Sequence, residues 1–457
     1  MRVPRWAECL LSGPTQQLSS ETATAPQDPL TGLPPRSMLA ELLTETRLQG
    51  QLPKTVSLLV VNLDRFKLVN DLCGHAAGDQ VLRVAAERLR RTTDEHMRLL
   101  HLGGDEFALL VPHMRGDGMA ESLARRILDT VSLPIDVCGR VVDVGASVGF
   151  AVDESGTSAA TDLLRAACIA MSRAKRDGGG AFCAFEPSMD VDLRDRAALE
   201  DDLRSGIQRG EIIAYYQPIF SLRSADLVGF ESLARWNHPQ RGMLDPGTFI
   251  PIAEDLDAIN DLCFTLLRQA CRDLRSWPAH LTLSINVSPI QICDPDLPLR
   301  LLQILYAGGI APGRLIVEIT ESALVRDVEL ARATITSLRN AGVKVALDDF
   351  GTGYSSLHHL RELQFDRIKI DRSFIEALDG FAGSKIVKAI VDLGQSLGMP
   401  VTAEGIETLE QATMLSNLGC TYGQGFLFGR PLPPAATLRM VIELEDDPNL
   451  LRAVGQN

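Results

Sequence analysis

The chain has 457 residues, of which 45% are hydrophobic and 23% charged, so it can form two to four globular domains with large cores. Its formal net charge of −14 argues against a protein that coats DNA or RNA, although metal ions or a few Arg side chains could still bind a small phosphorylated ligand. No apolar run approaches the roughly 20 residues that span a bilayer, and the nine Cys residues include no C-x-x-C pair, which predicts reduced thiols. We therefore expect a cytoplasmic protein whose partner is neither a nucleic-acid polymer nor a membrane.

The first part of the chain predicts a tail followed by one compact domain. Residues 1–27 are rich in Thr, Gln, Ser and Pro and predict disorder. The expected elements of the domain at 28–186 are a helix at 38–48, a strand at 56–63, a helix at 76–91, a hairpin over 99–111, a helix at 117–131, a strand at 142–152, a helix at 161–175 and a strand at 181–185. This order predicts an α+β domain with one central antiparallel sheet and helices on one side. Residues 187–200 are polar and charge-rich and predict a helical connector.

From 201 to 445 the sequence alternates between strand-like and helical patterns. Eight strand candidates occur at 214–220, 227–233, 281–287, 315–319, 344–349, 367–370, 400–406 and 422–428. Eight strands with intervening helices over about 250 residues predict an α/β fold, a (β/α)8 TIM-like barrel. In that fold the active site lies at the carboxyl ends of the strands. Residues 446–457 are expected to form a C-terminal tail.

Polar side chains stand at the ends of these strands. The set comprises Glu231, Asn286, Glu318, Asp348, Asp349, Lys369 and Glu404. A lone acid at a strand end is usually a helix cap or half of a surface ion pair. Several acids at successive strand ends, two of them adjacent, instead favour an oxygen-rich cage for hard cations such as Mg²⁺ or Mn²⁺.

These side chains are numerous enough for two ions. The first group comprises Glu231, Asn286, Glu318 and Asp348, and the second comprises Asp348, Asp349 and Glu404, with Asp348 as the bridge. Two ions roughly 3.5–4 Å apart can clamp a phosphodiester and activate water for in-line attack. Lys369 would then orient or deprotonate that water, or stabilise charge on the phosphoryl oxygens. Arg235 could form a bidentate pair with a substrate phosphate.

The region from about 196 to 445 resembles an EAL phosphodiesterase domain, the family that hydrolyses cyclic di-GMP to linear pGpG. The matching motifs are Glu231-Ser-Leu-Ala-Arg235-Trp, Asn286-Val-Ser-Pro, Glu318-Ile-Thr-Glu321, Asp348-Asp349-Phe-Gly-Thr-Gly, Lys369-Ile-Asp371, Ala-Glu404-Gly-Ile-Glu407 and Gln424-Gly. The resemblance implies six metal ligands at Glu231, Asn286, Glu318, Asp348, Asp349 and Glu404, with Lys369 handling the water. It also implies substrate contacts from Gln217, Arg235 and Gln424, a loop after the fifth strand held by Glu321, and a homodimer through this domain.

One position departs from the EAL signature. Ser232 stands where the family has Ala. We expect a small effect, because neighbouring side chains on a strand point to opposite faces and Ser232 therefore points away from Glu231.

Residues 28–186 resemble a GGDEF diguanylate cyclase domain. The matching segments are 28–36, 62–71, 74–79, 101–107 and 174–179. Physically, two Gly at a hairpin tip let phosphates approach backbone amides, and the two acids beside them can hold Mg²⁺. The resemblance implies GTP-binding candidates at Lys67, Asn70, Asp79, Asp105, Glu106 and Lys175.

The departures from this second family are numerous. Asn62 stands where the family has a metal-binding Asp, and His101 where it has Arg. Gly178–Gly180 replaces the usual Gly-Arg-Asn, and residues 94–97 lack the R-x-x-D of the inhibitory product site. A neutral Asn removes a full negative charge from a cation site. We expect a domain that keeps a guanine pocket, lacks efficient condensation chemistry, and binds GTP as an effector of its neighbour.

The sequence therefore predicts a two-metal cyclic di-GMP phosphodiesterase. Two alternatives stay open: a bifunctional protein whose first domain still makes cyclic di-GMP, and a non-catalytic receptor for the dinucleotide. The receptor has no need of two metal sites, so the complete acid set argues against it.

Overall fold

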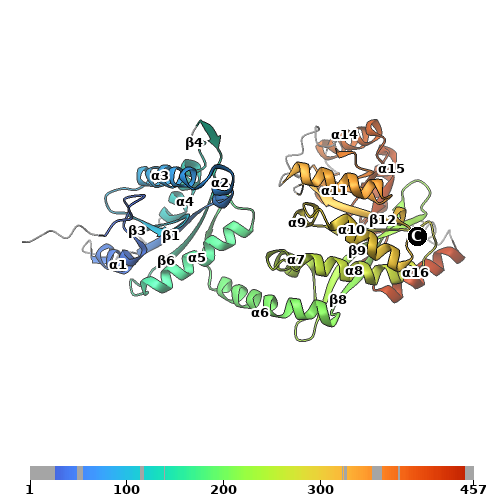
Figure 1. Ribbon diagram of the computed structural model, residues 1–457, viewed down its shortest axis with the longest axis horizontal. Coiled ribbons are helices and arrows are strands. Elements are labelled where there is room, and N and C mark those ends of the chain that lie inside the picture. Colours follow the sequence, from blue (N-terminus) through green and yellow to red (C-terminus); the bar gives the residue numbers. More distant parts are fainter. Residues whose placement is uncertain are drawn as a thin grey trace, which may run out of the picture. The chain divides into compact units, whose positions relative to one another are not determined.

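The protein is described by a computed structural model that covers residues 26–48, 55–113, 118–137, 139–321, 323, 327–351, 363–378 and 381–447. The chain divides into two compact units, Met1–Asp195 and Arg196–Asn457 (Figure 1). The expected tails at 1–27 and 446–457 lie almost wholly outside the described residues. Within the described part of the chain, no helix is both long and apolar enough to cross a membrane.

The first unit is built around a five-stranded sheet. Its elements are η1 (Arg36–Met38), α1 (Leu39–Leu48), β1 (Thr55–Leu63), α2 (Phe66–Cys73), α3 (His75–Thr92), β2 (Arg98–Gly103), β3 (Glu106–His113), α4 (Met119–Val131), β4 (Ile135–Val137), β5 (Arg140–Val142), β6 (Ala146–Asp153), α5 (Ala160–Arg176) and β7 (Phe182–Ala184). The strand order is β2-β3-β1-β6-β7, and β4 and β5 form a separate hairpin. All pairs in the sheet are antiparallel except β6 with β7. The expected central antiparallel sheet is present.

Helices cover both faces of this sheet, so the expectation of helices on one side is wrong. All nine residues of β1 are buried. Leu59 and Val61 pack with residues of α3 and α4, whereas Leu58 and Val60 pack with residues of α1 and α5. A strand covered on both faces has a continuous apolar sequence without alternation. The run of apolar residues in β1 is of this kind.

The segment that joins the two units is helical. Helix α6 (Pro187–Arg209) includes the predicted connector at 187–200 and extends nine residues beyond it. Its first turns are exposed, and its last turns bury Leu199, Leu203 and Ile207 in the second unit. The helix is therefore a connector at its amino end and part of a core at its carboxyl end.

The second unit begins within α6 and alternates strands with helices. Its elements are β8 (Ile212–Ser221), β9 (Leu227–His238), β10 (Gly242–Leu244), α7 (Pro246–Asp255), α8 (Ile259–Leu274), β11 (Thr282–Val287), α9 (Pro289–Ile292), α10 (Leu297–Gly308), η2 (Pro312–Arg314), β12 (Leu315–Thr320), α11 (Val328–Asn340), β13 (Lys344–Phe350), β14 (Arg367–Ile370), α13 (Arg372–Glu376), α14 (Phe381–Leu397), β15 (Val401–Ala403), α15 (Leu409–Leu418), β16 (Tyr422–Gln424) and α16 (Pro434–Asp446).

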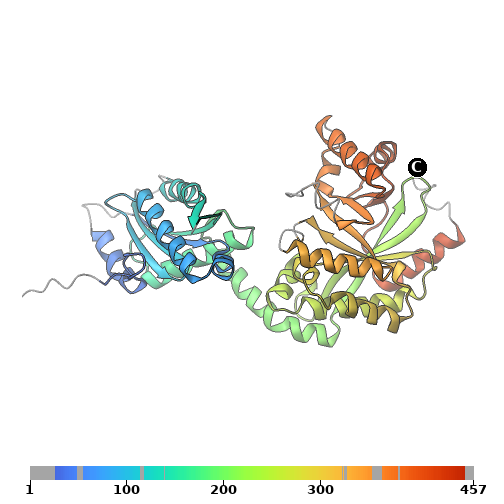
Figure 2. The ribbon, with the colours of Figure 1, turned by 45° about the horizontal axis from the view of Figure 1, so that its top comes forward.

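These strands close into a barrel, which confirms the predicted fold class. The closed order is β8-β9-β11-β12-β13-β14-β15-β16, with β8 paired to both β9 and β16 and β10 added outside β9. Figure 2 shows the strands surrounded by helices. Helix-facing residues such as Val317, Val345 and Leu347 form the main core with residues of the helices. The residues that alternate with them along each strand, such as Glu318, point into the barrel.

One strand of the barrel runs against the others. Strand β8 is antiparallel to both β9 and β16, whereas the pairs from β9 through β16 are parallel. A short connection of five residues joins β8 to β9, as an antiparallel hairpin allows. The alternating sequence pattern did not predict this direction. Its consequence is that Gln217, in the middle of β8, pairs with Glu231 in the middle of β9, while the carboxyl end of β16 pairs with Ile219.

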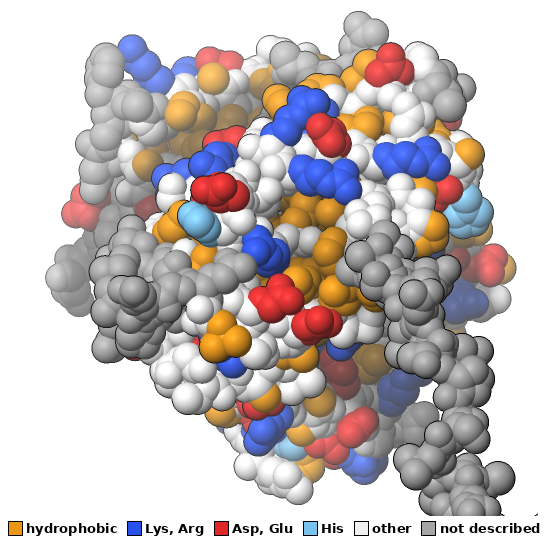
Figure 3. Space-filling model, turned by 90° about the vertical axis from the view of Figure 1, so that its left-hand side faces the viewer, with side chains coloured by type: hydrophobic (Ala, Val, Ile, Leu, Met, Phe, Trp, Pro, Cys, Tyr) orange, Lys and Arg blue, Asp and Glu red, His pale blue; other side chains and the backbone are white. Residues whose placement is uncertain are grey.

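Acidic and basic side chains are mixed on the face of the molecule that Figure 3 shows. On the face drawn in Figure 3, Lys and Arg side chains are interspersed with Asp and Glu, and hydrophobic side chains gather between them. A net charge of −14 therefore does not appear there as one continuous acidic patch.

Candidate functional site

The polar residues predicted at the strand ends converge inside the barrel. Strand pairing places Ser284 beside Glu231, Asn286 beside Glu318, and Thr320 beside Asp348. Alternation along each strand turns the acids and Asn286 inward. Because parallel strands end at the same rim, these side chains meet at the carboxyl end of the barrel.

Lys369 lies at the centre of this group. Its Nζ is 2.6 Å from Glu318 Oε2, 2.6 Å from Glu404 Oε1, 3.2 Å from Asp348 Oδ2 and 3.6 Å from Glu231 Oε2. The Lys369 side chain is only 1% exposed. One buried ammonium therefore links acids from four different strands or strand ends.

The charge state of Lys369 follows from these neighbours. Burial alone would lower its pKa, because a desolvated ammonium is costly. Asp348, Glu231, Glu318 and Glu404 oppose this effect and raise the pKa of Lys369 well above its ordinary value. Lys369 is thus a protonated hydrogen-bond donor, and one cation faces four carboxyl groups.

The pKa values of several carboxyl groups in this site are raised. Burial, with added repulsion from Glu231 and Asp348, raises the pKa of Glu318 to about 7 despite the attraction of Lys369. Burial, followed by the charges of Asp348 and Asp371, raises the pKa of Asp349 to about 6. The pKa of Glu404 is also well above its usual range, with burial as the largest cause. A cluster of carboxyl groups with raised pKa values is stabilised by added positive charge.

A β-bulge in β13 changes the backbone at the two adjacent acids Asp348 and Asp349. The step from Leu347 to Phe350 in β13 faces the shorter step from Ile368 to Ile370 in β14, so one extra residue is inserted. Asp349 adopts a left-handed backbone with φ 53°, and its amide donates to Asp348 Oδ1 at 3.0 Å. In a regular strand the two side chains would point to opposite faces. The bulge removes that constraint.

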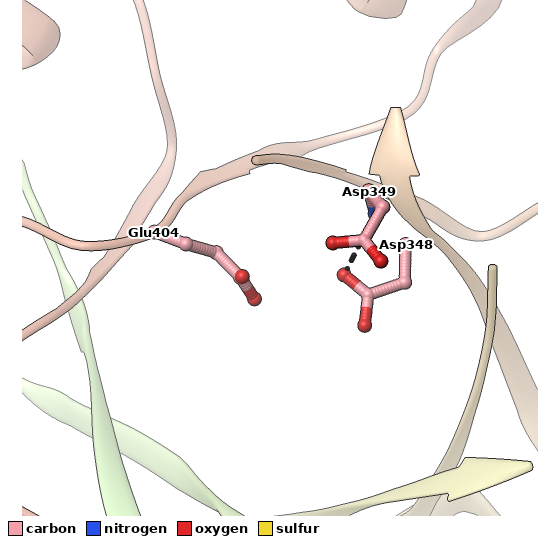
Figure 4. Close-up of side chains that lie close together, drawn as sticks. All are labelled: Asp348, Asp349 and Glu404. Carbon is pink, nitrogen blue, oxygen red and sulfur yellow. Dashed lines mark hydrogen bonds between the residues drawn. The ribbon is translucent and has the colours of Figure 1, made fainter. Parts of the chain in front are cut away.

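Asp348, Asp349 and Glu404 form the tightest acid cluster among the described residues. Each offers a carboxylate oxygen, and these oxygens lie within 4.8 Å of one another. Figure 4 shows the carboxylate of Glu404 pointing across the barrel toward the two Asp side chains. Three carboxylates this close suit a hard divalent cation, which prefers such oxygen ligands.

Amide side chains form the other side of the site. Asn286 Nδ2 donates to Glu231 Oε1 at 2.6 Å, and Gln424 Nε2 donates to Glu231 Oε2 at 2.7 Å. The same Gln424 nitrogen is 3.0 Å from Gln217 Oε1, and Gln217 Nε2 donates to Gly429 O at 3.3 Å. Gln217 pairs with Glu231 in register, because β8 runs antiparallel to β9. The reversed strand thus brings Gln217 to the rim.

Two observations favour a metal at this site. The buried oxygens Glu318 Oε1 and Gln424 Oε1 have no hydrogen-bond partner. The acid set has several carboxyl groups around a single buried cation. Unpartnered buried oxygen atoms are costly unless a water or a cation contacts them. The donor set of carboxylates and amide oxygens fits Mg²⁺ or Mn²⁺ better than a softer metal.

Two predicted residues stand apart from the cluster. Arg235 is four residues beyond Glu231 on the same face of β9; its Nη1 donates to Ala234 O at 2.8 Å, and its Nε is 3.4 Å from Asp245 Oδ1. Glu321 Oε2 accepts a hydrogen bond from the amide of Gly351 at 3.2 Å. Gly351 begins the loop predicted after the fifth barrel strand, and residues 352–362 of that loop lie outside the described residues.

The first unit brings several of its predicted residues together at one end of its sheet. Asn62, at the end of β1, pairs in register with Glu106 of β3, and the amide of Leu63 donates to Asp105 O at 3.1 Å. Lys175 Nζ donates to Asn62 Oδ1 at 2.6 Å. Lys67 and Asn70 lie on α2, and Asp79 lies on α3. The neutral Asn62 therefore faces an ammonium at the position where the GGDEF resemblance expects a metal-binding acid.

Sequence reasoning missed Asp64 in this unit. Its carboxylate accepts from Ser147 Oγ at 2.7 Å and from the amide of Gly180 at 2.9 Å. It therefore anchors the turn at Gly178–Gly180 to the end of β1. Its place two residues after Asn62, at the end of an apolar strand, was the available signal.

Comparisons with known proteins cover both units. Two family models match: the EAL domain over residues 200–431, and the diguanylate cyclase GGDEF domain over residues 25–181. The bifunctional diguanylate cyclase/cyclic di-GMP phosphodiesterase MucR of Pseudomonas aeruginosa is 36% identical over 420 residues, which are 91% of this chain and 61% of that protein. The cyclic di-GMP phosphodiesterase NbdA of the same organism is 34% identical over 418 residues, which are 90% of this chain and 53% of that protein. The chain thus spans only about half to three fifths of the length of these relatives.

A solved structure resembles the second unit. The phosphodiesterase of PaMucR, in complex with c-di-GMP, is 38% identical and superposes with a TM-score of 0.51. The match covers 52% of this chain and 99% of that one.

Proposed function

Because the chain belongs to the family of proteins that carry a GGDEF domain followed by an EAL domain, we propose that it hydrolyses cyclic di-GMP to linear pGpG. The observation that carries this proposal is the buried Lys369 ammonium among four carboxyl groups at the rim of the barrel. A site that is rich in acids and contains one fixed donor suits metal-assisted attack of water on a phosphodiester. The names of MucR and NbdA and the PaMucR complex add support from relatives.

The proposed metal ligands fall into two groups that share Asp348. One comprises Glu231, Asn286, Glu318 and Asp348, and the other comprises Asp348, Asp349 and Glu404. Two Mg²⁺ or Mn²⁺ ions bound there would supply an activated water and positive charge near the phosphoryl oxygens. The close carboxylates of Asp348, Asp349 and Glu404 support the second group most directly.

The other side chains position the reactants. Lys369 is held as a hydrogen-bond donor, so we assign it to orienting the attacking water or to stabilising a phosphoryl oxygen, and not to removing a proton. Gln217 and Gln424 hold Glu231 in place through their mutual hydrogen bonds and present amides to the substrate. Arg235, on the same face of β9, can meet a substrate phosphate as a planar fork. Glu321 would fix the start of the loop after β13.

A chelator-controlled assay tests this proposal. The full chain is incubated with cyclic di-GMP and Mg²⁺ or Mn²⁺, with and without EDTA, and the nucleotides are separated by chromatography. Linear pGpG that forms with metal and not with EDTA is the expected result. Tight binding of cyclic di-GMP without turnover would show a receptor instead. A Glu404→Gln variant, which keeps the size of the side chain, should lose most turnover, whereas Glu410→Gln at an exposed position of α15 should not.

A second activity has one observation in its favour. The relative MucR is named as both a cyclase and a phosphodiesterase. Against this alternative, Asn62 accepts a hydrogen bond from Lys175 where a cyclase needs an acid for its metal. We therefore assign the first unit to binding GTP as an effector, through Lys67, Asn70, Asp79, Asp105, Glu106 and Lys175.

We further propose a cytoplasmic location and a homodimer through the second unit. The seven described cysteines are all free, as a reducing compartment requires. The dimer rests on resemblance to EAL domains. Light scattering of the purified chain over a range of concentrations would test the dimer, and a monomer mass at every concentration would refute it.

A further inference from the structure

A groove lined by arginines lies between α8 and α10 of the second unit. Arg268, Arg272 and Arg275 approach it from α8, while Ile304, Ala307 and Gly308 approach it from α10. The groove has a volume of about 410 Å³, and no acidic residue lines it. Pockets for small ligands have volumes of roughly 300–1,000 Å³. The groove is therefore large enough for a small anion.

The three arginines lack the partners that other arginines of this unit have. Arg196 pairs with Asp255, and Arg339 pairs with Asp366. Among the described residues, no ion pair or hydrogen bond involves the guanidinium of Arg268, Arg272 or Arg275. In a chain with 59 acidic and 45 basic residues, such a cluster without acids reverses the local sign of charge. The dipole of α8 stabilises the positive charges of Arg272 and Arg275 near its carboxyl end, but it provides no hydrogen-bond acceptor for their guanidinium N–H groups.

The spacing of the arginines indicates the size of the anion. They occur at i, i+4 and i+7, so they share one face of α8 and span roughly 10 Å along it. Each guanidinium is a planar fork that can bind a phosphate with two hydrogen bonds. A single phosphate is too small to meet all three forks. A chain of phosphates matches both their number and their total charge.

Small residues shape the floor of the groove. A Cβ on Gly308 would lie 2.8 Å from Cys271 Cβ, so α8 and α10 are in close contact there. Ala307 of α10 presents only a methyl group to the groove, which Gln303 and Ile304 also line. The α10 side of the groove therefore carries no charge, and the guanidinium donors come from the α8 side.

The groove is remote from the acid cluster. The carboxyl end of α8 leads into the amino end of β11, which begins at Thr282. Asn286, by contrast, stands near the carboxyl end of the same strand. A ligand in the groove would therefore lie at the opposite rim of the barrel and could not touch the reacting atoms.

From these observations we infer that the groove between α8 and α10 binds an oligophosphate anion, either an inorganic phosphate chain or the phosphates of a nucleotide. Binding there is independent of the hydrolysis proposed for the opposite rim. It gives the second unit a site through which a phosphorylated metabolite can act on it.

Calorimetric titration of the full chain with inorganic triphosphate tests this inference. The buffer contains EDTA, so that no metal ion can hold phosphate at the carboxyl cluster. The expected result is saturable binding that weakens as KCl is raised, because each guanidinium–phosphate contact is screened by salt. The double variant Arg272→Gln/Arg275→Gln should bind about tenfold more weakly or worse.

Two further variants separate the groove from general surface charge. Ala307→Glu places a carboxylate beside the arginines and should block binding, whereas Ala307→Gln should not. Arg223→Gln/Arg439→Gln removes two exposed arginines elsewhere on the same unit and should leave the affinity unchanged. Circular dichroism melts confirm that each variant is folded. Absence of saturable binding by the wild type, or equal losses in both double Arg variants, would overturn the inference.

Titration with GTP distinguishes the two sources of phosphate, and it is done in an Asp79→Ala background so that the GTP site proposed for the first unit does not contribute. Equal affinities for GTP and triphosphate, both lost in Ala307→Glu, identify the phosphate chain as the ligand. If GTP binds more tightly than triphosphate and this binding is lost in Ala307→Glu, the groove also contacts the base. GTP binding that survives Ala307→Glu, together with no binding of triphosphate, would place the phosphates elsewhere and contradict the assignment.

Discussion

At the scale of single residues, Lys369 is the counter-ion of the acids at the barrel rim. It is the only cation within 4 Å of Glu231, Glu318, Asp348 and Glu404 among the described residues, and it is buried with them. Removing it would leave several carboxyl groups without a counter-ion in a poorly solvated interior. We therefore propose that Lys369 supports the metal-free protein electrostatically in addition to its proposed part in the reaction.

We predict that Lys369→Met lowers the rate of cyclic di-GMP hydrolysis by roughly 10²-fold or more, as expected for the loss of a fixed donor at a developing charge. The melting temperature in EDTA should also fall, and added Mg²⁺ should restore part of it by replacing the lost positive charge. Turnover assays and thermal melts with and without metal measure both effects. Lys344→Met, at the exposed start of β13, is the matched control. Wild-type turnover in Lys369→Met would contradict this role.

The sequence predicted which residues gather at the site more fully than it predicted their geometry. Strand periodicity alone placed Glu231, Glu318 and Asp348 at successive strand ends. It could not predict the bulge that turns Asp349 to the side of Asp348, because the extra residue and the positive φ depend on pairing with β14. Nor could it predict that Lys369 reaches four acids at once, since contact across a barrel depends on the stagger of strands far apart in sequence.

At the scale of secondary-structure elements, the ion pair between α1 and β6 holds a helix to the sheet of the first unit. Asp153, at the end of β6, is 2% exposed and accepts hydrogen bonds from Arg47 of α1, Ser155 and Ser158. Burial opposes its ionisation, but the hydrogen bonds of Ser155, Ser158 and Arg47 lower the pKa of Asp153 below its ordinary value. A carboxylate with a depressed pKa stabilises the fold above its unfolded pKa near 4 and loses that contribution as pH falls further.

We therefore predict that Asp153→Asn destabilises the first unit by about 2 kcal/mol at pH 7. The difference from the wild type should shrink as the pH falls from about 4 to 2. Hydrogen-exchange mass spectrometry of peptides from β6 and α1 reports the loss locally, without requiring the whole chain to unfold in one step. Asp162→Asn in the first turn of α5 serves as the control. A pH-independent difference would contradict the ionic account.

The elements also show where sequence patterns were sufficient. A strongly periodic helix such as α5 and an apolar strand such as β12 appear where their patterns predicted them. The direction of β8 was not encoded in any local pattern, because a strand has the same alternation in either direction. The two-sided cover of the first sheet was encoded in β1, whose unbroken apolar sequence requires burial on both faces.

At the scale of the whole molecule, α6 joins two units for which we propose different nucleotide ligands. The first unit would bind GTP, and the second would cut the cyclic dinucleotide. If GTP regulates hydrolysis, it must bind two states of the protein with different affinities. We predict that GTP changes the KM or kcat of cyclic di-GMP hydrolysis by about 5-fold or more and that Asp79→Ala in the first unit removes the effect. Steady-state kinetics at fixed free Mg²⁺ measures both, and an unchanged response to GTP in Asp79→Ala would remove the first unit from regulation.

A substitution at Asn62 tests why the first unit is not expected to act as a cyclase. Restoring an acid with Asn62→Asp places a carboxylate beside Lys175 and near Asp105 and Glu106. We predict that formation of cyclic di-GMP from GTP and Mg²⁺ is negligible in the wild type and rises in this variant, because the cation site regains a negative charge. A Glu404→Gln background prevents hydrolysis of the product during the assay. Robust synthesis by the unmodified chain would instead support the bifunctional alternative.

We propose that the acids at the rim of the barrel hold two divalent ions, and direct counting of bound metal tests this most directly. Equilibrium dialysis of the full chain against Mn²⁺ should show two more ions per chain in the wild type than in Asp348→Asn, because Asp348 belongs to both proposed ligand groups. Asp349→Asn, which tolerates the left-handed backbone, should remove one ion and keep the other. Equal Mn²⁺ binding by the wild type and Asp348→Asn would show that the cluster is not a metal site.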